Sequence, residues 1–192
     1  MINKKLLSFC VLFCLLAFAF TNISCTFDYG DKESLGDDQP DLIMENVEYV
    51  RVRAANPLAK LQAERVERYE KQSMVKLQNT TFEQYDGQGE EVNISGRTGN
   101  ATVEIDTGNI LMDRNVRIEV KKEDIILETY RLEWIDESKY LSAGDNNEVF
   151  VYKQNGTRFT GTGLQSDTRK RNWEFTGHVR GTYKNNDEDT EE

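Results

Sequence analysis

Residues 149–183 read VFVYKQNGTRFTGTGLQSDTRKRNWEFTGHVRGTY, and this stretch contains the clearest fold signal of the chain. Val149-Phe150-Val151-Tyr152 can alternate its side chains across a strand. The tripeptide Gln154-Asn155-Gly156 that follows is a tight-turn signal, because glycine tolerates a positive φ. The segment therefore predicts a β-hairpin, and no helical pattern or catalytic motif within it competes with that interpretation.

Three upstream segments alternate apolar and polar residues with the period of two that half-buried strands show. They contain Val92/Ile94, Ala101/Val103/Ile105 and Val116/Ile118/Val120. Turn signals separate them, at residues 86–89, 96–100, 106–109, 122–124 and 144–147. A spacing of roughly 10–20 residues between turns favours antiparallel hairpins over crossover helices. The sequence therefore predicts an all-β fold.

Residues 156–183 resemble the C-terminal strands of the LptC family of periplasmic lipopolysaccharide-export proteins. Gly156-Thr-Arg-Phe-Thr-Gly-Thr-Gly-Leu164 is similar to the family pattern G-T-x-F-x-x-T-G-L, and N-x-E and V-R-x-x-Y follow at matching spacing. Residues 129–142 resemble the family's T-x-x-L-x-(W/Y)-x-D…L-S strand pair. The resemblance covers about residues 42–183 and implies an elongated, twisted antiparallel β-jelly roll like those of LptA and LptC.

Residues 57–72 (PLAKLQAERVERYEKQ) permit two interpretations. They are rich in good helix formers, and Leu58, Leu61, Arg65 and Tyr69 can share one helical stripe. A strand would instead place Leu61 and Ala63 on one face. The LptC resemblance implies strands here, so we expect a strand despite the helical propensity.

An internal repeat of about 60 residues is also visible. Residues 101–117 and 163–180 both run through a strand, an Asp-Thr turn, a second strand and a Val-Arg pair. The repeat predicts equivalent hairpins stacked along one long pair of sheets, as in solenoid-like jelly rolls.

The N-terminus is a targeting segment. Lys4 and Lys5 precede the apolar run of residues 6–20. As a helix this run spans roughly 22 Å, which is short of a hydrocarbon core of about 30 Å. We expect a cleaved signal peptide over residues 1–24, with an uncleaved membrane anchor as the alternative.

All three cysteines, Cys10, Cys14 and Cys25, lie in this region, so the domain that follows has no disulfide framework. Cys25 follows the apolar run in a context similar to a bacterial lipoprotein cleavage site, although Asn22 stands where leucine is usual. We expect Cys25 to be lipidated, and its acyl chains would hold the protein on a membrane. Residues 25–41 then form a flexible tether, residues 42–184 the jelly roll, and residues 185–192 an acidic disordered tail.

Several function classes are excluded. The net charge of −10 argues against nucleic-acid partners. The only histidine, His178, has no nucleophile motif beside it, so it is expected to be a surface residue. No Cys/His cluster has zinc spacing and no glycine loop opens a helix, so we expect neither a metal, nor a cofactor, nor an enzyme. The basic cluster at residues 169–171 is expected to be a solvated loop.

The resemblance to LptC implies lipid transfer without catalysis. The protein would receive lipopolysaccharide, or another glycolipid, from the permeases of an inner-membrane ABC transporter and pass it to an LptA-like periplasmic bridge. It would lie in the periplasm, anchored to the inner membrane by lipid on Cys25 or by an uncleaved N-terminal helix. The alternative is a surface or periplasmic lipoprotein that binds a protein ligand.

Apolar residues of the predicted strands are expected to face the interior and to form the lipid path. They are Val103, Ile105, Val116, Ile118, Leu132, Trp134, Val149, Val151, Phe159, Trp173, Phe175 and Tyr183. The resemblance implies that Gly156 matches a functional glycine and that Trp173 and Tyr183 match lipid-path positions. Trp173 stands where the family often has a small residue, which would narrow the groove or give it an aromatic wall. The pattern does not distinguish an open groove from a packed core.

Overall fold

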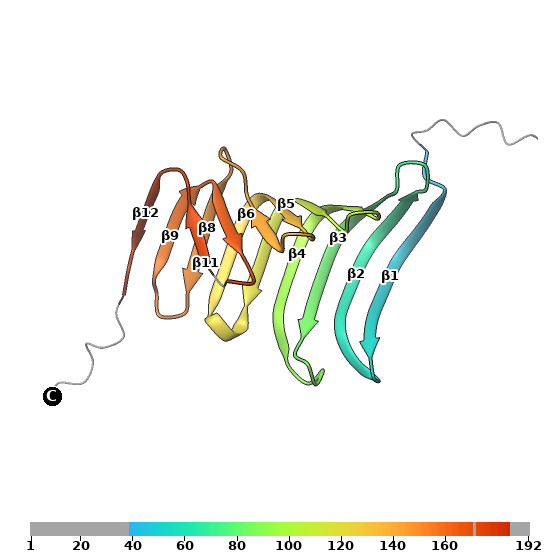
Figure 1. Cartoon of the computed structure of the whole chain (residues 1–192), viewed down its shortest axis with the longest axis horizontal. Helices are drawn as coiled ribbons and strands as arrows, with labels where there is room; N and C mark the ends of the chain where they lie inside the picture. The colour runs from blue at the N-terminus through green and yellow to red at the C-terminus, as the bar shows by residue number, and fades with distance from the viewer. Residues whose placement is uncertain (1–38, 171, 185–192) are drawn as a thin grey trace, which may run out of the picture. The chain divides into compact units, whose positions relative to one another are not determined.

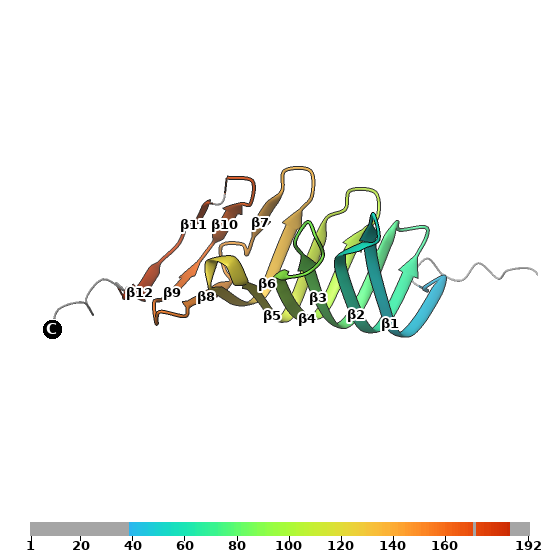
Figure 2. The same ribbon diagram turned by 90° about the horizontal axis from the view of Figure 1, so that it is seen from below.

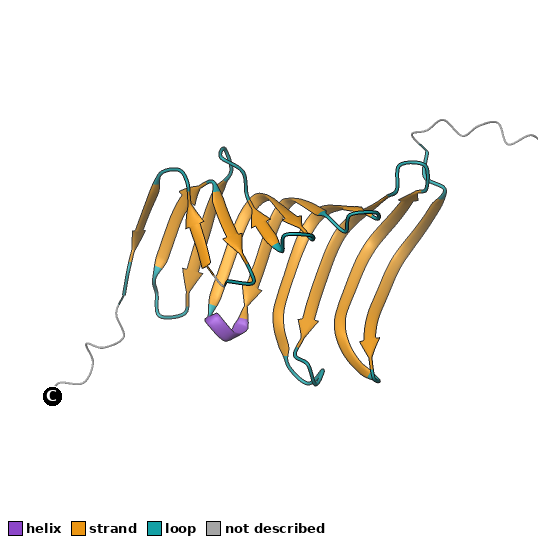
Figure 3. Cartoon of the chain, in the orientation of Figure 1, coloured by secondary structure: helices purple, strands orange, loops and turns teal. Residues whose placement is uncertain are grey.

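The computed structural model describes residues 39–170 and 172–184, so the targeting segment, Cys25 and the acidic tail lie outside the described residues. The described chain is a β-sheet of twelve strands (Figure 1). Its one helical element is η1 (Lys121–Glu123), a 3₁₀ turn between β5 and β6 (Figure 3). The strands are β1 (Leu42–Arg53), β2 (Asn56–Tyr69), β3 (Met74–Tyr85), β4 (Val92–Glu104), β5 (Ile110–Val120), β6 (Ile125–Ile135), β7 (Tyr140–Ser142), β8 (Glu148–Lys153), β9 (Arg158–Thr162), β10 (Leu164–Asp167), β11 (Asn172–Phe175) and β12 (Val179–Thr182).

All neighbouring strands are antiparallel, and β1 to β6 pair in chain order. After β6 the sheet divides, because residues 133–135 pair with β7 while residues 125–129 pair with β8. One branch continues through β10 to β11, and the other through β9 to β12. The antiparallel all-β fold predicted from the sequence is confirmed.

Each of the six long strands bends near its middle along a line that we call the crease (Figure 2). The pairing of residues is interrupted there in every pair of neighbouring long strands, and the register also shifts there between β4 and β5 and between β5 and β6. Asn46, Asn79, Arg114 and Asn115 lie on this line with φ between 48° and 62°. Asparagine tolerates this left-handed conformation better than most residues do. The bend directs the two halves of each strand into two facing layers.

The strands after β6 follow the same plan in two pieces. β7 and β8 are joined by residues 143–147, β9 and β10 by Gly163, and β11 and β12 by residues 176–178. We call layer 1 the layer that the branch β7-β10-β11 extends, which contains residues 133–135 of β6. Layer 2 is the layer that the branch β8-β9-β12 extends, and it contains residues 125–129 of β6. The described chain is thus a meander of six bent strands and three divided ones.

The positions of buried residues reveal the bend. Along a regular strand the inward side chains recur at every second residue. Across the crease of β2, β3, β4 and β6 they are three apart, as in Ala63/Val66, Leu77/Thr80, Thr98/Ala101 and Thr129/Leu132. In β5 the interval is four, because Arg114 and Asn115 are both left-handed. The change of interval keeps apolar side chains inside in both layers.

The prediction of a turn at residues 96–100 is wrong, because β4 runs through these residues without reversing. Glycine provides space there instead of a change of direction. A Cβ on Gly96 would lie within 2.3 Å of the Phe82 ring, and one on Gly99 within 2.9 Å of the Cβ of Arg114. Both glycines therefore permit close packing at and beside the crease.

The strand prediction for residues 57–72 is confirmed over most of its length by β2. The two copies of the internal repeat also occupy equivalent positions. The Asp-Thr turns at residues 106–107 and 167–168 both connect layer-1 strands, β4 to β5 and β10 to β11. After the crease, Val116 and Val179 each continue the chain in layer 2.

Candidate functional site

The inward side chains of the two layers form the apolar core, and they lie in rows across the strands from one register partner to the next. We call the space between the two layers the cleft. The row of layer 1 beside the crease is buried and contains Val66, Leu77, Ala101, Met112 and Leu132. The corresponding row of layer 2 is also buried and contains Ala63, Thr80, Thr98, Val116, Thr129 and Val149.

Burial falls with distance from the crease. The next row of layer 1 is half-buried and contains Val75, Val103, Ile110, Trp134 and Leu141. In layer 2 the next row, Leu61, Phe82, Ile118, Leu127 and Phe159, is half-buried too, although Val151 within it is buried. A closed sandwich would bury both rows equally. The gradient instead indicates a wedge-shaped cleft that is closed at the crease and opens away from it.

At the β1 end none of the residues that the structure describes covers the cleft. Leu42, Met44 and Tyr49 continue the inward rows onto β1, yet they are exposed, and Tyr49 keeps 58% of its surface. On the opposite face of β1, apolar side chains such as Val52 are exposed as well. Within the described residues, β1 pairs with β2 alone. This strand therefore presents apolar side chains on both faces.

The residues predicted for the lipid path divide into four groups. Val116, Leu132, Val149 and Val151 are buried beside or near the crease, and Val103, Ile118, Trp134, Phe159 and Phe175 are half-buried and face the cleft. Trp173 faces the cleft from the edge strand β11 and is 38% exposed. Ile105 and Tyr183 lie beyond the ends of β4 and β12 and are mostly exposed, so the structure does not bring them into the cleft rows.

Gly156 lies in the turn between β8 and β9, on the open side of layer 2. Its φ is 86°, and its N–H donates to the Lys153 carbonyl at 3.0 Å. A Cβ added to it would lie 3.1 Å from the side chain of Lys184, which can move. The backbone conformation, more than lack of space, requires glycine here.

Three aromatic rings meet across the layers at the end of the cleft opposite β1. The ring centroids of Phe159 and Trp173 are 6.1 Å apart, and those of Trp173 and Phe175 are 5.8 Å apart, both edge to face. Phe159 comes from β9 in layer 2, and the other two come from β11 in layer 1. We call these three residues the aromatic cluster.

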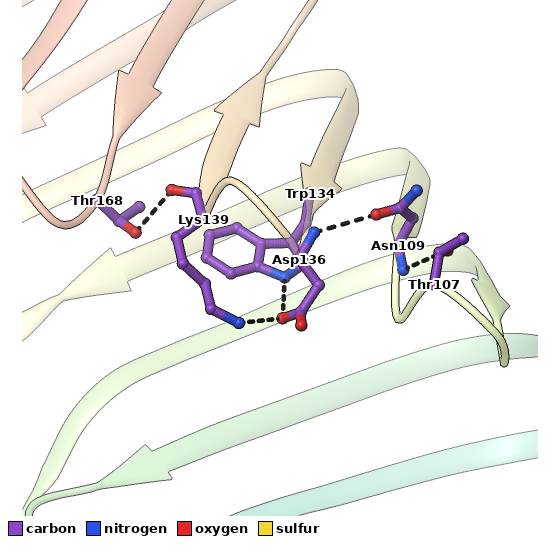
Figure 4. A network of polar contacts seen from close by, with 6 residues as sticks. All are labelled: Thr107, Asn109, Trp134, Asp136, Lys139 and Thr168. Carbon is purple, nitrogen blue, oxygen red and sulfur yellow. Dashed lines mark hydrogen bonds and ion pairs between the residues drawn. The ribbon is translucent and has the colours of Figure 1, made fainter.

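A network of polar contacts joins three turns on the open side of layer 1 (Figure 4). The Asp136 N–H donates to the Asn109 side chain at 3.0 Å, which links the β6–β7 turn to the β4–β5 turn. Thr168, after β10, donates its hydroxyl to the Lys139 carbonyl at 2.9 Å. The Trp134 indole donates to Asp136 at 3.1 Å, so the network also holds a cleft side chain.

Asp136 is the charged centre of this network. Lys139 forms an ion pair with it at 2.6 Å. The ion pair first, and the indole N–H of Trp134 second, hold the pKa of the Asp136 carboxyl below its ordinary value. The Lys139 ammonium also lies 5.8 Å from the centre of the Trp134 ring, within cation–π range.

A polar hollow of about 520 Å³ lies on the outer face of layer 2, away from the cleft. Its lining includes Lys60, Gln62, Arg97, Arg117 and Glu119. Lys60 pairs with Glu48 at 3.0 Å and Arg117 with Glu128, so the protein itself neutralises two of these cations.

The remaining sequence candidates lie outside the cleft rows. His178 is exposed in the loop between β11 and β12. Arg169 and Lys170 pair with Asp167 at 3.4 and 3.3 Å. No cluster of His, Cys, Asp and Glu in residues 39–170 and 172–184 could hold a metal ion. The same residues contain no helix that is long and apolar enough to cross a membrane.

Several cleft residues were not among the sequence candidates. They include Val66, Leu77, Phe82, Thr80, Thr98, Thr129 and Leu164. A signal existed for Leu77 and Phe82, which lie on the inward face of one strand. A search for apolar residues at every second position does not place Leu77 and Phe82 on the same face, because the inward positions shift by one residue at Asn79.

A known protein family matches most of the chain. The family described as "Lipopolysaccharide-assembly, LptC-related" matches residues 7–184. Among curated proteins, none matches the chain. A crystal structure of LptH, described as the LptA-homologous periplasmic component of the lipopolysaccharide transport device of Pseudomonas aeruginosa, is similar with a TM-score of 0.49 and 13% identity. That similarity covers 66% of this chain and 95% of LptH.

Proposed function

Because this chain belongs to the LptC-related family of lipopolysaccharide-assembly proteins, we propose that it transfers lipopolysaccharide or a related glycolipid across the periplasm. It receives the lipid from an inner-membrane ABC transporter and passes it to an LptA-like bridge protein. The observation that supports this proposal most directly is the fall in burial from the crease to the open side of the cleft. Acyl chains inserted from that side would cover the half-buried rows.

The hydrophobic effect supplies the affinity without any catalytic group. Each apolar Å² removed from water contributes about 25 cal/mol, so even partial cover of these rows favours binding. The headgroup stays outside, in water or against the polar open side. Transfer then requires only that successive partners bind with graded affinity, while the transporter supplies the energy.

The β1 edge is the docking site for a partner sheet. Strands with apolar side chains on both faces are normally covered on both faces. A strand added beside β1 would pair with its backbone and bury both Tyr49 and Val52, which lie on opposite faces. The cleft would then continue from one protein into the next.

Lipid on Cys25 holds the domain at the periplasmic face of the inner membrane in this proposal. Metabolic labelling with palmitate should mark the wild-type protein and fail to mark Cys25→Ala. Equal labelling of the two would favour an uncleaved N-terminal helix as the anchor.

Photo-crosslinking in cells tests the lipid path. A benzophenone amino acid at Ile118, which faces the cleft, should capture lipopolysaccharide in an adduct detected with an antibody against it. The same amino acid at Glu119, the next residue of β5, points to the outer face and is the matched control. Equal capture at both positions would contradict a path through the cleft. Capture at neither would favour a closed core and a lipoprotein that binds a protein ligand.

A further inference from the structure

The two ends of the cleft differ. At the β1 end the inward side chains Leu42, Met44 and Tyr49 are exposed. At the other end the aromatic cluster spans the gap between the layers, with Phe159 from layer 2 against Trp173 from layer 1. An acyl chain lying along the cleft is therefore free to extend at one end and is stopped by rings at the other.

The rings occupy space that glycines leave open. A Cβ on Gly161 would lie 2.8 Å from a ring carbon of Phe175, and a Cβ on Gly181 would lie 2.6 Å from a ring carbon of Phe159. Both glycines belong to layer 2, on β9 and β12. The rings of Phe175 and Phe159 therefore lie directly on the backbone of layer 2.

Trp173 has the freedom to turn. It belongs to β11, a strand of four residues that pairs within the described residues with β10 alone. Its side chain is 38% exposed, so a change of rotamer moves the ring toward solvent without breaking the β10–β11 ladder. Phe159, by contrast, lies on β9 between two paired strands.

We propose that the aromatic cluster is a gate, in which Trp173 is the moving part and the gap between the layers that its contact with Phe159 spans is the exit for acyl chains. This inference rests on the proposed function, because it assigns the cleft an acyl-chain ligand. In the closed state the rings retain the chains, and in the open state the chains pass toward the β11 and β12 edges.

Release kinetics test the gate. The full-length protein, purified from membranes, is loaded with lipopolysaccharide, and release into an excess of detergent micelles is followed over time. Trp173→Ala should release the lipid about two- to tenfold faster, the ratio that corresponds to losing the edge-to-face contact with Phe159 across the layers. Trp173→Phe keeps a ring and should release it at nearly the wild-type rate.

Two controls separate a gate from a damaged fold. Tyr130→Ala removes an exposed aromatic ring at the crease, on the face opposite the cleft, and should leave release unchanged. The circular dichroism and melting temperature of each variant show whether it is folded. Equal release from folded Trp173→Ala and wild type would overturn the gate.

A second measurement does not depend on lipopolysaccharide. The chain has two tryptophans, so Trp134→Phe leaves Trp173 as the only indole. A detergent with a brominated alkyl chain quenches indoles that it contacts. Trp173 should be quenched more strongly than the indole introduced by Tyr130→Trp in a chain lacking both natural tryptophans. If the wild type loads no lipopolysaccharide, the proposed function fails, and this comparison alone decides the gate. Equal quenching at the two sites would overturn it.

Discussion

The indole N–H of Trp134 and the ammonium group of Lys139 both donate to one carboxylate oxygen of Asp136, at 3.1 and 2.6 Å. One charged residue in an exposed turn therefore fixes the orientation of a half-buried aromatic residue of the cleft. The same turn is tied to Asn109 through the Asp136 backbone, so the open side of layer 1 is held at several points.

The stabilising effect of Asp136 should depend on pH. Its pKa is lowered in the folded protein, chiefly by Lys139. The unfolded chain therefore takes up a proton first, near its ordinary pKa of about 3.9, and the contribution is present above that pH. It is lost as the pH falls through the lower, folded pKa. Asp136→Asn should lower the melting temperature at pH 7, and the difference from wild type should shrink below a pH of about 4.

Melting curves at a series of pH values provide this measurement, and Glu137→Gln in the same turn is the control for general charge effects. A difference between Asp136→Asn and wild type that persists unchanged to low pH would mean that side-chain shape, and not charge, is responsible.

Two threonines at the crease should respond oppositely to loss of their hydroxyl. Thr98 Oγ1 lies 2.7 Å from the Asn100 carbonyl and 2.8 Å from the Asp113 carbonyl, while buried Thr80 Oγ1 has no hydrogen-bond partner among the described residues. Thr98→Val should lower the free energy of unfolding by about 1–3 kcal/mol, because it removes a hydroxyl that donates to two partly buried carbonyl oxygens. Thr80→Val should be neutral or stabilising, because it removes an unpaired polar group. Urea denaturation measures both, and equal losses would show that these hydrogen bonds do not stabilise the crease.

The sequence predicted the strands but not the bend. Alternation over Val116/Ile118/Val120 reports only which side chains share a face of one segment. It does not report that the chain turns through Arg114 and Asn115, since an arginine with positive φ has no composition signal. The turn predicted at residues 96–100 is wrong because a glycine in the sequence is equally compatible with a turn, a bulge or close packing of a strand.

The sequence predicted best those candidate residues whose apolar character alone is enough to place them in the core. Leu132 and Val149 are fully buried, as their apolar character indicates. Ile105 has the right character and spacing but follows the end of β4, where the Asp-Thr turn begins, so it is exposed. The contact of Trp173 with Phe159 joins different layers, and no local pattern encodes such a contact.

Two substitutions of Gly156 distinguish the effect of backbone strain from an effect on the lipid path. Gly156→Ala should cost about 1 kcal/mol, because φ is 86° and a Cβ disfavours this conformation. Gly156→Arg has the same backbone strain and adds a long charged side chain on the open side of the cleft. If the lipid path passes here, the arginine variant should lose lipid capture in cells while melting at the same temperature as Gly156→Ala. Equal capture by the two variants would limit Gly156 to a structural role.

The Phe82 ring lies against Gly96, its register partner on β4. A Cβ on Gly96 would be 2.3 Å from the ring and 2.9 Å from the Arg117 carbonyl oxygen of β5. In the inward row of layer 2, Phe82 thus lies beside a residue without a side chain, Gly96, and its ring can cover the backbone of β4.

Gly96→Ala should therefore destabilise the protein by about 1–3 kcal/mol through overpacking. Gly87 provides the matched control, since a Cβ there would meet nothing within 4 Å, and Gly87→Ala should be nearly neutral. The physical cause can be isolated with Phe82→Leu, which removes the ring from the clash. In the Phe82→Leu background, Gly96→Ala should lower the free energy of unfolding by less than it does in the wild type. The difference between the two losses, measured by denaturant unfolding, should be about 0.5 kcal/mol or more. An unchanged cost would place the strain at the Arg117 carbonyl instead of the ring.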